Sequence, residues 1–499
     1  MRTHPSPLSS HPASEDWSLD PRDEAGNSSE GWETFRADAH RALDDMIDHI
    51  GSIRSRPVWQ PAPPAVQEAF RRPTPVQGEA LSGVLDEFQR LIVPYANGNG
   101  HPLFMGWVHG AGTPVGMVAD MLAAGLNSNC GGRNHIAHEV EAQITRWMAD
   151  AIGYPRDASG LFVTGTSMAN FLAVLIARDN ALGHSVRKSG LAGAGTKLAA
   201  YASSEAHGCV RRAMELAGIG SDHLAAIPVG PDGTIRLDLL ETRIAEDRRA
   251  GLTPFLVVGT AGSVNTGAID DLDRLADIAE AHRLWFHVDG AFGALCVLAP
   301  ELKPLVKGLE RAKSIAFDFH KWLQVPYDAG FLICREPAQH VGTFADNAAY
   351  LQRAERGLAA GEIWPTDLGP DLSRGFRALK TWFTFKVYGI ERLGEAIEGT
   401  CRVAQHLKSL VERSDRFELR APVKLNIVCF SAKGADAGEV NTALVMDLHE
   451  SGLAAPSITT LGGKPVIRCA IVNHRTRLSD MDRFIEVAEA AVGRLAGQA

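Results

Sequence analysis

The sequence lacks the features that would place it in a membrane or outside the cell. It contains no apolar run of about 18 residues and no apolar N-terminal segment of the kind that directs secretion. Its seven cysteines are odd in number and scattered, without a Cys-x-x-Cys pair. This pattern disfavours a disulfide framework or a zinc site and favours reduced thiols in a cytoplasm. We therefore expect a soluble cytoplasmic protein without a bound metal.

Positive charge is also in short supply. The chain has 50 lysines and arginines against 59 aspartates and glutamates, which gives a formal net charge of −9. A negative surface is poorly suited to binding nucleic acid or an anionic membrane, so neither is an expected partner.

What the chain does have is length and an ordinary globular composition. Its 499 residues are 45% hydrophobic and 22% charged, which fits a soluble protein larger than one ordinary domain. Strands and helices alternate from about residue 160 to 335, which indicates an α/β fold with a mostly parallel sheet and helices on both faces. Later signals indicate a small C-terminal α+β domain. The predicted parts are a disordered tail at 1–30, a helical segment at 31–113, a large domain at 114–392 and a small domain at 393–499.

The most informative residue is Lys321, which follows a short apolar strand and precedes a Pro-Tyr-Asp turn. Phe319 and Trp322 flank it closely in sequence, so we expect a desolvated amine with a lowered pKa. Such a lysine is a nucleophile that forms Schiff bases with carbonyl cofactors. The alternative is a lysine at a strand end whose charge reaches solvent.

A second apolar strand, at 284–288, ends in Asp289. In α/β sheets, ligands bind beyond the carboxyl ends of the strands. Beside a Schiff-base lysine, an aspartate there suits a pyridoxal phosphate enzyme, because its carboxylate keeps the pyridinium nitrogen protonated and lets the ring accept electrons. Taken alone, Asp289 could instead cap a helix or bind a metal.

A third strand leads into Gly165-Thr166-Ser167 and then a helix. A helix N-terminus offers free N–H groups and partial positive charge, which suit a phosphate, and the two hydroxyls add donors. The alternative is that these hydroxyls simply cap the helix.

Two motifs together resemble a known family: His-Val-Asp-Gly-Ala-Phe-Gly at 287–293 and His-Lys-Trp-Leu-x-x-Pro-Tyr-Asp at 320–328. They are similar to the group II pyridoxal phosphate-dependent decarboxylases, which include the aromatic amino acid, histidine and glutamate decarboxylases. The similarity runs from about His101 to about Met481. It implies the fold type I architecture of pyridoxal phosphate-dependent transferases, with the cofactor in the large domain. It also implies a homodimer whose active site lies at the subunit interface, with the 31–113 segment packed on the partner.

The resemblance also implies roles for individual residues. His207 would stack on one face of the cofactor ring and handle protons near the substrate carboxylate, and Ala291 would cover the other face. His320 would join Thr166, Ser167, Asp289 and Lys321 in binding the cofactor. The candidate substrate-pocket residues are Trp107, His109, Asn127, Arg133 and Trp364.

The chain departs from the family pattern in two places that bear on chemistry. Val264 stands where the family usually has a threonine that contacts the cofactor. The expected mobile segment at 342–372 lacks the usual tyrosine at 362–368, and its only tyrosine is Tyr350. The proton that replaces CO2 would then come from Tyr350, His207 or water, or the carbanion would meet oxygen and yield an aldehyde.

The predicted function is pyridoxal phosphate-dependent decarboxylation of an L-amino acid to its amine and CO2 through a Schiff base on Lys321. Trp107 and His109 allow an aromatic substrate, which we favour. An acidic or polar substrate is allowed by Asn127, Asn129 and Arg133. The alternatives are an oxygen-consuming aldehyde synthase, another pyridoxal phosphate reaction such as transamination or carbon–carbon lysis, and a non-catalytic binding subunit with the same fold.

Overall fold

The computed structural model describes residues 19–22, 28–346, 352–434 and 436–496. Backbone contacts divide the chain into two units, Met1–Ile53 with Ala62–Ala96 and Arg54–Pro61 with Asn97–Ala499. Most of the tail predicted at 1–30 lies outside the described residues, and the first helix, α1 (Ser28–Gly51), begins within its last residues.

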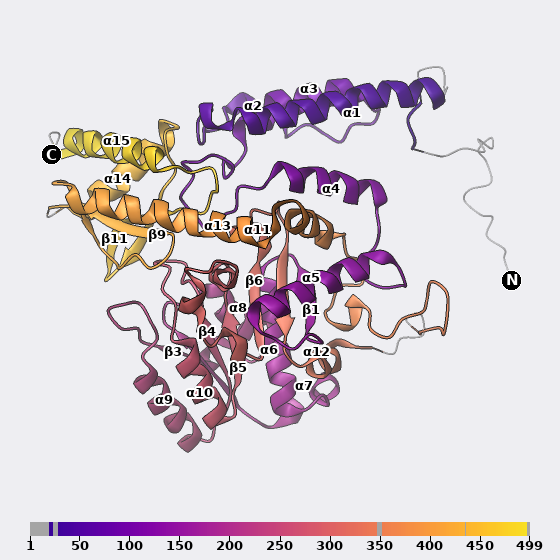
Figure 1. Ribbon diagram of the computed structural model, residues 1–499, viewed down its shortest axis with the longest axis vertical. Coiled ribbons are helices and arrows are strands. Elements are labelled where there is room, and N and C mark those ends of the chain that lie inside the picture. The colour runs from indigo at the N-terminus through magenta and orange to yellow at the C-terminus, as the bar shows by residue number, and fades with distance from the viewer. Residues whose placement is uncertain (1–18, 23–27, 347–351, 435, 497–499) are drawn as a thin grey trace. The chain divides into compact units, whose positions relative to one another are not determined.

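The first unit is helical. Besides α1 it contains α2 (Pro64–Ala69) and α3 (Leu81–Leu91). Helices α1 and α3 run side by side (Figure 1), and Arg41 of α1 bonds Asp86 of α3 at 2.7 Å. In the single chain, Trp32, Phe35 and Ile47 of α1 remain exposed. The helices therefore have little apolar core of their own.

The second unit is built on a seven-stranded sheet of order β1-β7-β6-β5-β4-β2-β3. Strands β2 to β6 pair in parallel, and β7 pairs antiparallel with both β1 and β6. The prediction of a mostly parallel sheet is confirmed. The strands are β1 (Ser159–Val163), β2 (Leu198–Ser203), β3 (Leu224–Ile227), β4 (Thr253–Thr260), β5 (Trp285–Asp289), β6 (Ser314–Asp318) and β7 (Gly330–Cys334).

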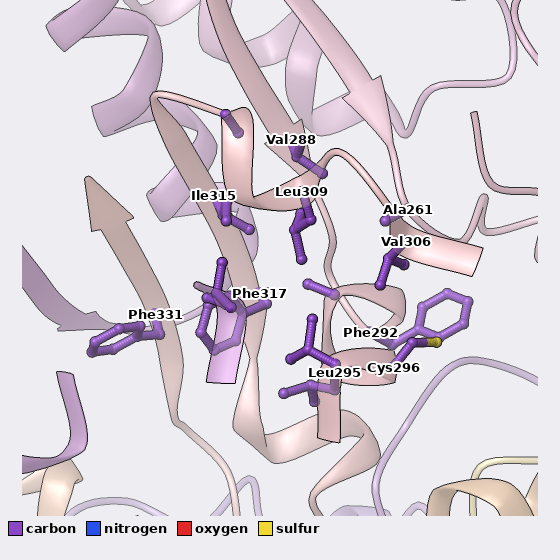
Figure 2. Packing of buried hydrophobic residues seen from close by; sticks show 14 of the residues in the cluster. Ala261, Val288, Phe292, Leu295, Cys296, Val306, Leu309, Ile315, Phe317 and Phe331 are labelled. Atoms are coloured by element: carbon purple, nitrogen blue, oxygen red, sulfur yellow. The ribbon is translucent and has the colours of Figure 1, made fainter. Parts of the chain in front are cut away.

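Apolar side chains cover both faces of this sheet, because successive residues of a strand point to opposite sides. In β4, Val257 packs in one core cluster, while Leu256 and Val258 pack in the other. Helices α5, α9 and α10 contribute to the first cluster, and α6 and α8 to the second. Figure 2 shows part of the first cluster around Val288, Ile315 and Phe317.

The helices of this region are α4 (Pro114–Leu126), α5 (Ile136–Ile152), α6 (Thr166–Leu182), α7 (Val186–Ala194), α8 (Gly208–Leu216), α9 (Leu237–Arg249), α10 (Leu272–His282), α11 (Phe319–Trp322) and α12 (Pro337–Phe344).

The predicted C-terminal α+β domain is also present. It contains a second sheet, antiparallel throughout, of order β10-β11-β9-β8. The long helix α13 (Arg377–Arg413) leads into it and bends at Gly389, whose φ is 71°. The remaining elements are β8 (Phe417–Leu419), β9 (Ile427–Ala432), α14 (Ala437–Glu450), β10 (Ser457–Leu461), β11 (Lys464–Ala470) and α15 (Leu478–Ala496).

Three global features bear on the expectations from composition. Within the described parts of the chain, no helix has both the length and the apolar character needed to cross a bilayer. The same residues contain no cluster of three or more His, Cys, Asp or Glu side chains arranged to hold a metal. All seven cysteines are buried and unpaired.

Candidate active site

A cavity of about 330 Å³ lies at the carboxyl ends of the central strands, next to the start of α6. This edge of an α/β sheet is where ligands usually bind. The cavity gathers residues that the sequence places far apart, and most of the predicted site residues are among them. These are Trp107, His109, Thr166, Ser167, His207, Asp289, Ala291, His320 and Lys321.

Asp289 is the last residue of β5 and is only 5% exposed. Its Oδ2 accepts a hydrogen bond from Asn170 Nδ2 at 3.0 Å, and its Oδ1 accepts one from the backbone N–H of Ala291 at 3.2 Å. Burial raises the pKa of this carboxyl group, although the nearby charges of Lys321 and His207 oppose the rise. A buried carboxylate of this kind favours a cationic partner in the cavity, such as a protonated ring nitrogen.

Lys321 lies on α11, directly after β6, and 22% of its side chain is exposed. Its Nζ is 2.9 Å from Oδ2 of Asp318. The prediction of a lowered pKa is wrong. Burial does lower the pKa of Lys321, but attraction to Asp318, their hydrogen bond and the charge of Asp289 outweigh burial and leave the pKa raised. The amine is therefore held as an ammonium ion.

The aromatic neighbours of Lys321 in sequence do not enclose its amine. Phe319 packs in the core against Phe162 and Phe331, and the buried Trp322 donates to Thr400 Oγ1 at 2.9 Å. The side chain that does contact the amine is Asp318, the last residue of β6 and 2% exposed. Burial tends to raise the pKa of Asp318, but the charges of Lys321 and His320 have a larger, opposite effect. The pKa of Asp318 is therefore lowered, and the carboxyl group stays ionised.

The turn before α6 has the features of a phosphate site. The backbone N–H of Thr166 is not free, because it donates to Asp318 Oδ1 at 2.7 Å. The Oγ1 of Thr166 is buried and has no hydrogen-bond partner among the described residues, and Ser167 beside it is exposed. A buried hydroxyl without a partner costs free energy, which a bound anion at this helix N-terminus would recover. The amine, the buried carboxylate and this turn fit the aldehyde, ring nitrogen and phosphate of pyridoxal phosphate.

The two predicted histidines meet the same cavity. His207 precedes α8 and is exposed, and its Nδ1 accepts the N–H of Cys209 at 3.2 Å, which leaves Nε2 as the nitrogen that carries a proton. His320 is buried, and its Nδ1 accepts the N–H of Ala329 at 2.9 Å. Burial lowers the pKa of His320. Its ring lies 4.3 Å from that of Tyr327.

Only part of the predicted substrate wall is at this cavity. Trp107, half exposed, stacks near His109 with ring centroids 6.1 Å apart, and Tyr327 meets His109 edge-on at 6.0 Å. Burial, with a further effect of the charge on Lys321, lowers the pKa of His109, so its ring is neutral. The wall is therefore aromatic and carries no positive charge from this histidine.

The other predicted wall residues lie elsewhere in the single chain. Asn127 ends α4 with a left-handed φ of 46°. The guanidinium of Arg133 sits 5.0 Å from the ring of Trp364, which is 2% exposed. None of these three side chains lines the cavity. Tyr350 lies outside the described residues, whereas Val264 does line the cavity, as its place in sequence implied.

Three residues that contact Asp289 or Lys321 were not predicted from the sequence: Asn170, Cys209 and Asp318. Asn170 lies four residues after Thr166 and therefore on the same face of α6, which is the one signal that could have found it. Cys209 lines the cavity, and its Sγ lies 3.8 Å from Asp289 Oδ2. Burial, with the charge of Asp289, raises the pKa of Cys209 to about 12, so it is a thiol.

Comparisons with known proteins show which family the chain resembles. Residues 63–433 match the family model described as the pyridoxal-dependent decarboxylase conserved domain. The aromatic-L-amino-acid decarboxylase of Bacillus atrophaeus is 32% identical over 463 residues, which cover 90% of this chain and 93% of that protein.

Solved structures of similar fold cover almost the whole chain. Oryza sativa TDC, determined with PLP and tryptamine, has a TM-score of 0.85 and 27% identity, covering 93% of this chain and 98% of that one. Rhodiola rosea 4-hydroxyphenylacetaldehyde synthase has a TM-score of 0.83 and 25% identity, covering 92% and 98%. The predicted resemblance is confirmed. This chain belongs to the pyridoxal-dependent decarboxylases, carboxy-lyases that act on amino acids with pyridoxal phosphate as cofactor.

Proposed function

We propose that this enzyme converts an aromatic L-amino acid to its amine and CO2, with Lys321, Asp289 and His207 as its catalytic residues. One observation carries the proposal: the Lys321 amine, the buried Asp289 carboxylate and the partnerless Thr166 hydroxyl belong to one cavity. These three groups suit the aldehyde, the ring nitrogen and the phosphate of the cofactor, respectively.

Each residue has a chemical task in this proposal. Lys321 would hold the cofactor through its aldehyde group. Asp289 keeps the ring nitrogen protonated, and Thr166, Ser167 and the N-terminus of α6 hold the phosphate. When bound, pyridoxal phosphate supplies the electron sink that accepts the pair released as the bond to the carboxylate breaks. His207 covers the ring and can carry a proton on Nε2.

The aromatic preference rests on the wall of the cavity. Trp107, His109 and Tyr327 offer aromatic surfaces, and the ring of His109 is neutral. The names of the Bacillus relative and of the tryptamine-bound Oryza structure support the same substrate class.

We also propose a cytoplasmic homodimer. Large apolar side chains are exposed on α4 and α13, including Leu126 at 64% and Val387 at 56%. A second copy of the chain would bury such surface. Asn127, Arg133 and Trp364 could then complete the partner's cavity. A cytoplasm would keep the seven buried thiols reduced.

A second candidate product is the aldehyde. The stretch at 362–368 contains no tyrosine to protonate the carbanion, and the similar Rhodiola protein is named an aldehyde synthase. In that reaction one amino acid, one O2 and one water yield one aldehyde, one CO2, one ammonia and one H2O2.

A screen of the twenty amino acids in air and under argon separates the two products. We expect CO2 and amine in equal amounts, with aromatic substrates turned over fastest and with no dependence on oxygen. Stoichiometric H2O2 and ammonia in air would replace this proposal with the aldehyde synthase. Release of CO2 from acidic substrates alone would contradict the aromatic preference.

The ion pair between Asp318 and Lys321 predicts how the cofactor loads. Because the pair raises the pKa of Lys321, the free amine that attacks the aldehyde forms only at higher pH. Replacing Asp318 by asparagine keeps an oxygen for the Thr166 N–H but removes the charge. The pH profile of loading, followed by the absorbance of the bound cofactor, should move to lower pH by roughly 1–3 units. An unmoved profile would mean that Asp318 does not control the amine.

A further inference from the structure

A chain of buried polar side chains runs away from the cavity behind Asp289. Asn170 Nδ2 lies 3.0 Å from Asp289 Oδ2, and Asn170 Oδ1 lies 2.7 Å from His287 Nε2. His287 Nδ1 lies 2.8 Å from Ser314 Oγ, which lies 2.8 Å from Trp285 Nε1. None of the four residues behind Asp289 is more than 1% exposed. Buried polar groups that form a closed set of hydrogen bonds hold one arrangement of the atoms around them.

The chemistry of the two ends sets the direction of every bond in this chain. An ionised Asp289 can only accept, so the amide of Asn170 must turn its NH2 group toward the carboxylate. The amide oxygen then faces His287, which must carry its proton on Nε2. Burial lowers the pKa of His287 to about 3, so the ring is neutral and Nδ1 has a lone pair. That lone pair accepts the hydroxyl proton of Ser314.

The other end agrees with this assignment. The indole nitrogen of Trp285 can only donate, and it donates to the Ser314 oxygen. The hydroxyl proton of Ser314 is thereby left for His287. Four hydrogen bonds therefore run in one direction, from Trp285 to Asp289, and each donor is matched to one acceptor.

A second arrangement exists if Asp289 is protonated. Its hydroxyl would donate to the oxygen of a flipped Asn170 amide, and the amide NH2 would donate to His287 Nε2. The proton of His287 would then sit on Nδ1, which is 3.1 Å from the backbone oxygen of Ser314. The tautomer of His287 therefore reports the charge on Asp289.

We propose that His287 is a positioning residue that acts through Asn170 to hold Asp289 ionised and oriented toward the cofactor ring. His287 does not line the cavity, so it has no direct role in the reaction. The inference rests on the proposed function, because it gives the relay the task of supporting the carboxylate that pairs with the ring nitrogen. The sulfur of Cys209, 3.1 Å from Asn170 Nδ2, accepts the other amide hydrogen, so both N–H groups of the Asn170 amide have a partner.

The direct test is nitrogen NMR of the holoenzyme labelled with ¹⁵N-histidine. We expect a His287 signal of the Nε2–H tautomer that does not change between about pH 5 and pH 8, where an ordinary histidine titrates. The signal is assigned by its loss in His287→Gln. A proton on Nδ1 in the holoenzyme would overturn the proposal.

Variants provide the second test. His287→Leu leaves the Asn170 oxygen without a donor, and we expect kcat to fall by roughly 10–100-fold, as for other groups that orient a reactive residue. His287→Gln can still donate to Asn170 and should recover most of this loss. Equal losses in both variants, or none in either, would contradict the relay. If His287→Leu does not fold, the NMR measurement on the unsubstituted enzyme still decides.

A matched control separates the relay from loss of any buried histidine. His340 is fully buried, bonded to Ser159 Oγ at 2.9 Å and to the Leu368 oxygen at 2.7 Å, without contact to Asp289. His340→Gln should leave kcat close to that of the parent once folding is verified. If the parent itself binds no pyridoxal phosphate, the proposed function fails. If the parent loads and reacts but His287→Leu matches it, only the relay fails.

Discussion

Replacing Lys321 by alanine is expected to abolish turnover. The side chain supplies the only amine among the residues lining the described cavity, and its covalent bond to the cofactor orients the ring for the substrate. We expect kcat to fall by about 10⁴-fold or more, a loss typical of removing a nucleophile. The absorbance that marks a covalently held cofactor should disappear at the same time. Both are measured by a decarboxylation assay and a spectrum of the purified variant mixed with pyridoxal phosphate.

Lys307 provides the control for this substitution. Its side chain is 74% exposed and pairs with Asp273 at 2.8 Å on the surface. Lys307→Ala should keep the absorbance and the activity of the parent. If Lys321→Ala retained both, the amine would have to come from elsewhere, and the site proposed here would be wrong.

Replacing Asp289 by asparagine is expected to have the second largest effect. An amide has the same shape but cannot hold the ring nitrogen as a pyridinium, so the electron sink is weakened. We expect kcat to fall by about 10³-fold, while the covalent bond at Lys321 and its absorbance remain. The decisive measurement is therefore kcat at full cofactor occupancy.

Asp270 is the matched control for the carboxylate. It is also buried, 3% exposed against 5% for Asp289, but its oxygens accept the backbone N–H groups of Ile235 and Thr260, each at 2.8 Å. Asp270→Asn should lower the melting temperature but leave kcat near that of the parent. Near-normal turnover in Asp289→Asn would contradict the role of Asp289, whereas equal losses of kcat in both variants would indicate general damage to the fold.

The parts of the site that could be predicted are those that depend on local sequence. Lys321, Asp289 and Thr166 each stand where an apolar run ends, and parallel strands end at the same edge of a sheet. The large sheet and the C-terminal helices follow from the same periodicities. In the C-terminal domain the sequence predicts strands at 423–431 and 466–471, which correspond to β9 and β11. It did not predict β8 or β10, although Gly462-Gly463 between β10 and β11 is a hairpin turn signal.

The parts that could not be predicted depend on which way side chains point. Asp318 was visible three residues before Lys321, but its bond to Thr166 joins positions 152 residues apart. Flanking aromatics suggested a lowered lysine pKa, yet they face the core and the carboxylate decides the charge. His287 and Asn170, 117 residues apart, are likewise brought together only by the packing of α6 on the sheet.

Gly330 begins β7 and pairs with Val163 on one side and Asp318 on the other. A Cβ at this position would lie 2.3 Å from the Cα of Gly165. The backbone of the strand after the lysine therefore rests directly on the turn before α6, and neither can be remodelled alone. Libraries meant to redirect the enzyme to new amino acids should leave Gly165 and Gly330 unchanged. They should vary Trp107, which is 50% exposed, and His109 on the wall of the cavity.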